Sequence, residues 1–176
     1  MQKTNVLKKP EHHIIHGDNN FPNNDYLPVL IYKHAFDQKE TKLGDAIEET
    51  FNKNNWTNSW RNGILEEHHY HSNSHEVLGI SSGECKIQLG GPNGPLFDVS
   101  KGDVVILPAG IAHRNLECSK DFECVGGYPE GIEPDMRYGK PEDRPETDEN
   151  IRKVQFPETD PVYGYDGALL TFWMMQ

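Results

Sequence analysis

The stretch from residue 63 to 128 is divided by turn-forming residues into short apolar segments, and no other feature constrains the fold as strongly. Six segments have the length and composition of strands, and Gly, Pro and Asn separate several of them. They are residues 64–71, 76–81, 84–89, 96–99, 104–107 and 121–128. Short strands at this spacing are typical of a β-sandwich or barrel. The turn GGPNGP at 90–95 is expected to join two of them as a hairpin.

One helix is predicted outside this region, over residues 42–55. Its apolar positions recur at helical spacing and are Leu43, Ala46, Ile47 and Phe51. Trp56 and Trp60 follow the predicted helix, and we expect both to anchor its end against the core.

The length of 176 residues fits one domain. We expect a flexible N-terminal arm over residues 1–20 and a single domain over 21–176, whose chemistry lies within 63–128.

Residues 129–161 show little periodicity beyond a short helical turn at 149–154, so they are expected to form a lid or a wrapping segment. The apolar end at 168–175 predicts a buried strand or a packed terminal segment.

Charge and cysteine content exclude several classes of partner. The 28 acidic residues outnumber the 17 basic ones, and no basic cluster could follow a phosphate backbone. Nucleic acid and anionic membranes are therefore not expected partners. The three cysteines have no metal-type spacing, and the first residues contain no apolar signal segment. We expect a reduced, cytoplasmic protein.

The sequence HHYHSNSHE at 68–76 holds four of the nine histidines. In a strand, side chains two apart share a face, so His69 and His71 would point together while His68 points away. Glu76 opens the next strand and could face the same interior. Imidazole with carboxylate suits Fe, Mn, Ni, Co, Cu or Zn rather than Ca.

Spaced residues surround this cluster in the order Gly, five residues, His-x-His, four residues, Glu, six residues, Gly. The positions are Gly63, His69, His71, Glu76 and Gly83.

A second set follows as Gly102, Pro108, Gly110 and His113, in the order Gly, five residues, Pro-x-Gly, two residues, His. Together the two sets resemble the paired motifs of the cupins. The one departure is Glu117, which stands where the family has an asparagine with a structural role. Segments such as LPAGIAHRN, GGYPEG and DPVYGYDGALLTFW are similar to the bacterial YjlB-like cupins from about residue 21 onward.

This resemblance implies an all-β, antiparallel jelly-roll β-barrel with one N-terminal helix and a long irregular C-terminal excursion. It also implies one divalent transition metal (Fe, Mn, Ni or Zn) held by His69, His71, Glu76 and His113. His75 could join the metal only if a bulge turned it inward, because it neighbours Glu76 in the strand.

An octahedral metal with four protein ligands would keep two open positions, which could serve dioxygenase or isomerase and epimerase chemistry on a small polar or carbohydrate-like molecule. The alternatives are a non-catalytic cupin that binds or senses a small molecule or sugar, and a purely structural metal site. Glu67, Tyr128 and Arg137 are candidates for catalytic roles, although a solvated carboxylate for Glu67 and a surface salt bridge for Arg137 are the simpler interpretations. Jelly-roll cupins often pair through sheet edges that would otherwise be exposed, so the resemblance also implies a homodimer.

Overall fold

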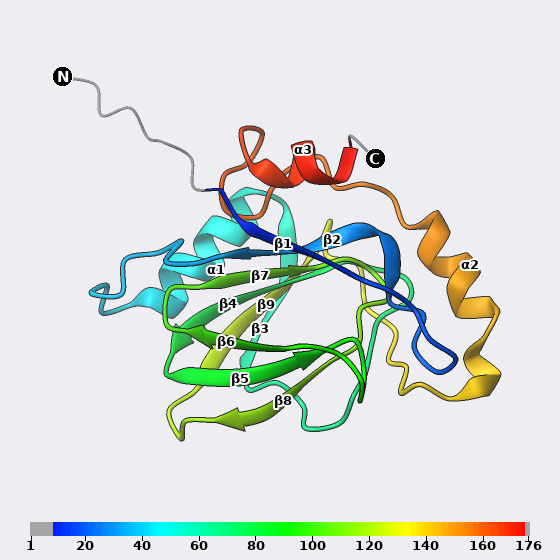
Figure 1. The fold of residues 1–176 in the computed structure, drawn as a ribbon. Helices are drawn as coiled ribbons and strands as arrows, with labels where there is room; N and C mark the ends of the chain where they lie inside the picture. Colours follow the sequence, from blue (N-terminus) through cyan, green and yellow to red (C-terminus); the bar gives the residue numbers. More distant parts are fainter. Residues whose placement is uncertain (1–8, 175–176) are drawn as a thin grey trace.

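A computed structural model describes residues 9–174, which form two antiparallel sheets, three α-helices and one short 3₁₀ helix (Figure 1). The larger sheet has six strands in the order β1 (Glu11–Ile15), β2 (Asn24–Tyr32), β7 (Val104–Leu107), β4 (Glu76–Ser82), β9 (Glu123–Pro129) and β3 (Trp56–Asn62). The smaller sheet has the order β6 (Leu96–Ser100), β5 (Glu84–Leu89) and β8 (His113–Cys118). The predicted antiparallel β-fold is confirmed, but the strand ladders do not close into the expected barrel.

The large sheet separates two hydrophobic cores, because successive side chains of a strand point to opposite faces. In β4, Leu78 and Ile80 join the inner core, which also contains side chains of the small sheet. Val77, which precedes Leu78, joins the outer core. Here α1 (Leu43–Lys53) and α3 (Ala168–Met174) cover the sheet. This alternation decides which residues of β4 and β9 can reach the site described below.

Helix α1 confirms the predicted periodicity, since Leu43, Ile47 and Phe51 are its buried residues. The C-terminal end is also a helix and not a strand, because Leu169 and Trp173 of α3 are buried at a spacing of four. None of the helices in the described part of the chain has the length and apolarity that a membrane crossing requires.

The segment 129–161 is less irregular than predicted. It contains a 3₁₀ helix (Pro141–Asp143) and α2 (Glu146–Lys153), which begins before the expected turn at 149–154. Acidic residues occupy the first turn of α2 and basic ones the last, which complements the helix dipole. Figure 1 shows α2 at the side of the sheets.

Part of the expected N-terminal arm is a strand. Residues 11–15 form β1, which pairs with β2. His12 contacts Phe172 and His13 contacts Phe97, with ring centroids 4.7 and 4.9 Å apart. Residues 1–8 of the expected arm lie outside the described residues.

The predicted strand at 64–71 is wrong. The strand in this part of the chain is β3, which lies before the predicted range and ends at Asn62. Residues 63–75 form a loop, which isolated β-bridges at His69 and Tyr70 hold in place. Among the described residues, β3 lies at the edge of the large sheet and pairs with β9. Its sequence WTNSWRN is mostly polar, so it lacks the apolar run from which a strand is predicted.

The two tryptophans of β3 belong to different cores. Trp56 packs in the outer core beside α1, as predicted, whereas Trp60 packs against the inner core. Residues four apart would share a face of a regular strand, but the register of β3 shifts between Thr57 and Trp60, and Asn58 has a φ of 58°. This bulge turns Trp60 to the inside.

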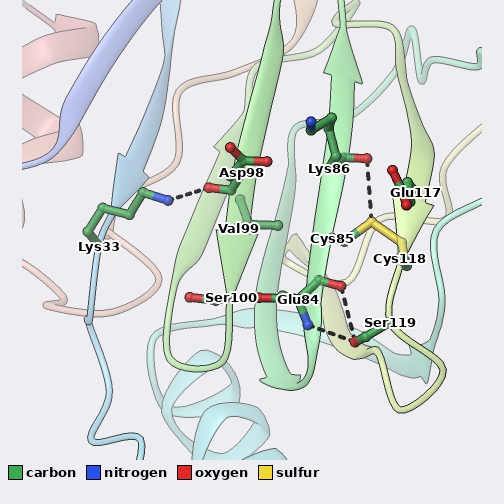
Figure 2. Close-up of a pocket in the computed structure, with 10 residues that line it drawn as sticks. All are labelled: Lys33, Glu84, Cys85, Lys86, Asp98, Val99, Ser100, Glu117, Cys118 and Ser119. Atoms are coloured by element: carbon green, nitrogen blue, oxygen red, sulfur yellow. Dashed lines mark hydrogen bonds between the residues drawn. A yellow bond between two sulfur atoms is a disulfide. The ribbon is translucent and has the colours of Figure 1, made fainter.

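The expectation of a fully reduced chain is also corrected. Cys85 and Cys118 are paired across β5 and β8 and form a disulfide, whereas Cys124 is free and buried. Both cysteines line a surface cavity of about 560 Å³. Figure 2 shows the disulfide among the residues that line it.

Candidate metal centre

Three histidines converge at one point between the two sheets. His69 lies in the loop 63–75 and His113 opens β8, and their backbones exchange hydrogen bonds of 3.2 and 2.9 Å. His71 lies two residues further along the loop. One ring nitrogen of each histidine lies within 4.8 Å of the others, and all three side chains are buried. This group could therefore hold a metal ion.

The other ring nitrogen of each histidine is held by a backbone carbonyl. The Nδ1 atoms of His69, His71 and His113 lie 2.9, 2.6 and 2.9 Å from carbonyl oxygens. The accepting residues are Glu67, Asp135 and Ile111, respectively. A carbonyl only accepts hydrogen bonds, so each Nδ1 carries the proton. In a neutral imidazole this leaves the lone pair on Nε2, the arrangement common among metal-binding histidines.

Glu76 opens β4 and reaches the same point from the large sheet. Its Oε2 lies 3.0 Å from Nε2 of His71 and 3.2 Å from Nε2 of His113. With both Nδ1 atoms already protonated, these Nε2 atoms would direct lone pairs at a carboxylate oxygen. Such a contact requires positive charge between the atoms, supplied by a second proton on the imidazoles or by a metal ion. The donor set fits a divalent transition metal.

The pKa values reflect this burial and this proximity. Burial and then His113 lower the pKa of His69 to about 3, so its imidazole is neutral near pH 7. Burial opposes the charged form of His71, but the Glu76 carboxylate raises the pKa of His71 above its ordinary value. Burial also acts to raise the pKa of Glu76, and the neighbouring His71 and His113 hold it well below its usual range.

Asp135, which the sequence analysis did not single out, ties the segment 129–161 to the histidine loop. Its backbone oxygen accepts from His71, and its carboxylate accepts from the backbone N–H and hydroxyl of Ser72 at 2.6 and 2.5 Å. Arg137 pairs with the carboxylates of Asp135 and Asp143. These contacts connect residue 135 to the loop 63–75, and no sequence signal marks Asp135 among the many acidic residues.

Of the candidate catalytic residues, Tyr128 lies at the site and Glu67 and Arg137 do not. The Tyr128 hydroxyl donates to Oε1 of Glu76 at 3.2 Å. The side chain of Glu67 is exposed, and only its carbonyl contacts His69. The Arg137 guanidinium is used in the salt bridges above, as in the simpler interpretation.

His75 faces away from the three histidines, as expected for a neighbour of Glu76. Its Nδ1 accepts from the backbone N–H of Ala109 at 2.9 Å, and its ring lies 4.7 Å from that of Trp173 in the outer core. Its remaining nitrogen lies 3.2 Å from the carbonyl oxygen of Gln155. Burial lowers its pKa to about 4, so it is a neutral part of the core.

Comparison with known proteins places this site in a family. The sequence model of the cupin domain matches residues 61–125, which include the three histidines and Glu76. Over 157 residues, the chain is 38% identical to "Uncharacterized protein YjlB" of Bacillus subtilis (strain 168), covering 89% of this chain and 92% of that protein.

Two solved structures illustrate the structural matches. A Klebsiella pneumoniae protein with a double-stranded β-helix domain is 15% identical with a TM-score of 0.38, and the match covers 79% of this chain and 90% of that one. Procruciferin, the 11S globulin of Brassica napus, is 20% identical with a TM-score of 0.37, and the match covers 46% of this chain and only 21% of the globulin. The sequence matches alone decide the assignment: the chain belongs to the cupin family and is a relative of YjlB.

Proposed function

We propose that this cupin binds one divalent transition metal through His69, His71, His113 and Glu76, and that it is a metal-dependent enzyme. The observation that supports this most directly is the contact of two Nε2 atoms with Oε2 of Glu76, because protonated Nδ1 atoms leave lone pairs facing a carboxylate. A metal ion would satisfy all of these atoms at once.

The bound metal would supply a Lewis acid, or a redox centre if it is iron, for dioxygenase or isomerase and epimerase chemistry. Three neutral imidazoles and one carboxylate would leave a divalent ion with one net positive charge. Four protein ligands leave two positions of an octahedral ion for a small polar or carbohydrate-like molecule that chelates through oxygen. The side chains of all four ligands are buried, and charge interactions are stronger in such an environment than in water.

The reaction class can be tested with metal-loaded protein and a panel of chelating hydroxy acids, keto acids and sugars. Oxygen consumption by the iron form would identify a dioxygenase, and substrate-derived proton exchange or epimer formation followed by NMR would identify an isomerase. The His71→Ala variant serves as the control that lacks the site. Saturable ligand binding with no turnover by any metal form would contradict catalysis and identify a binding cupin.

We also propose a homodimer. Within the described residues, β6 pairs with no strand other than β5, so this edge of the small sheet presents backbone groups that a second copy could cover. The opposite edge, at β8, is partly paired with the loop 63–75 through His113 and Asn115. Light scattering should give twice the chain mass of 20.1 kDa, and a monomer mass would contradict the proposal.

A further inference from the structure

The carboxylate of Glu76 is held at both oxygens by different partners. Oε2 faces the Nε2 atoms of His71 and His113, whereas Oε1 accepts a hydrogen bond from Tyr128. Glu76 and Tyr128 lie in neighbouring strands, β4 and β9, and both side chains are buried. Of the two oxygens, Oε2 is the one that contacts His71 and His113.

The direction of the Tyr128 hydrogen bond is fixed by a second residue. The indole Nε1 of Trp60 lies 2.9 Å from the Tyr128 oxygen, and an indole N–H can only donate. The phenol oxygen therefore accepts from Trp60, and its single proton is free for Oε1 of Glu76. Trp60, Tyr128 and Glu76 form a hydrogen-bond chain with one possible direction.

Two backbone features allow this chain to form. The bulge in β3 turns Trp60 to the inner face of the sheet, as described above. Gly126 of β9 lies opposite Trp60 of β3 and leaves room for the indole. A Cβ at this position would lie 2.0 Å from Cε2 of Trp60. Any side chain at Gly126 would thus displace the residue that orients Tyr128.

We propose that Tyr128, oriented by Trp60, is a positioning residue that restricts Glu76 to binding the metal through one oxygen. This inference rests on the proposed metal site. With Oε1 committed to the phenol, Glu76 would hold a metal through Oε2 alone, which would leave coordination positions free for a substrate. Without the hydroxyl, Oε1 is free to enter the coordination sphere.

The test is cobalt(II) binding by wild type, Tyr128→Phe and the control Tyr32→Phe. Tyr32 is also a buried tyrosine that donates to a carboxylate, Asp160, but it lies in the outer core. The two substitutions therefore remove the same group from opposite faces of one sheet. The measurements are the cobalt dissociation constant and the visible d–d absorption bands, which respond to coordination number.

We expect Tyr128→Phe to weaken cobalt binding by about tenfold or more and to change the position and intensity of the d–d bands. Trp60→Phe should change both in the same direction and by less, because it removes only the group that orients the phenol. Tyr32→Phe should match wild type in both measurements.

Three outcomes would overturn the inference. Bands and affinity of Tyr128→Phe equal to wild type would show that the phenol does not position Glu76. An equal change in Tyr32→Phe would show a general effect of losing a buried hydroxyl. Absence of cobalt binding by the wild-type protein would overturn the metal site itself and this inference with it.

Discussion

His75 and Glu76 are consecutive residues whose side chains lie on opposite faces of the six-stranded sheet. The imidazole of His75 packs 4.7 Å from Trp173 in the outer core, while Oε2 of Glu76 lies 3.0 Å from Nε2 of His71 on the inner side. Both side chains are about 2% exposed, so burial does not distinguish them. Their roles differ because the pleat of the strand separates them.

This relationship predicts that substitutions of the two neighbouring residues change different properties of the protein. Glu76→Gln removes the carboxylate charge while keeping the shape, and it should weaken metal binding by more than about tenfold. His75→Gln should leave metal content unchanged and lower only stability. Metal titration of the two purified variants checks this, and loss of metal in His75→Gln would make His75 a ligand.

Asp135 should control metal affinity from outside the ligand set. Replacing it with Ala frees Ser72 and loosens the carbonyl that holds Nδ1 of His71, so the metal dissociation constant should rise by about tenfold. Asp143→Ala is the matched control, because Asp143 also pairs with Arg137. Chelator competition gives both constants, and equal values for the two variants would contradict the role of Asp135.

Tyr32 predicts a dependence of stability on alkaline pH. Burial, followed by the charge of Asp160, raises its pKa well above the ordinary value of 10. Below pH 10 the phenol is neutral in the folded and unfolded chains. Above pH 10 the unfolded chain ionises first, so the free energy of unfolding falls by up to about 1.4 kcal/mol per pH unit.

Tyr32→Phe lacks this group, so its free energy of unfolding should fall less than that of wild type between about pH 9 and about pH 11. Urea denaturation at several pH values measures the difference. Parallel pH profiles for the two proteins would show that the pKa of Tyr32 is not raised by folding.

The disulfide between Cys85 and Cys118 predicts the thiol count. Protein unfolded without reductant should react with a thiol reagent at Cys124 alone, and prior reduction should raise the count from one to three. A count of three before reduction, in protein purified without reductant, would mean that the pair is not bonded.

Several features of this fold could be read from the sequence because local patterns encode them. The spacing of Leu43, Ile47 and Phe51 specifies α1, and turn residues delimit β4, β5 and β7 closely. His113 was found because glycine turns precede it, and it does begin β8.

Other features depend on contacts between distant residues. His69 and His71 reach the site from a loop held by His113 and Asp135, and not from the predicted strand. The position of Trp60 depends on a bulge at Asn58, and the sequence WTNSWRN contains no pattern that predicts this bulge. Asp135 acquires its role only because it contacts His71 and Ser72, which are distant from it in the sequence.

The metal content of the purified protein tests the central claim most directly. Protein prepared without chelator or nickel resin should contain about one equivalent of a transition metal per chain by elemental analysis. His71→Ala should lose that metal while circular dichroism shows an intact fold, and the matched variant His68→Ala should retain it. Less than about a tenth of an equivalent in the wild-type protein, or unchanged metal in His71→Ala, would contradict the proposed site.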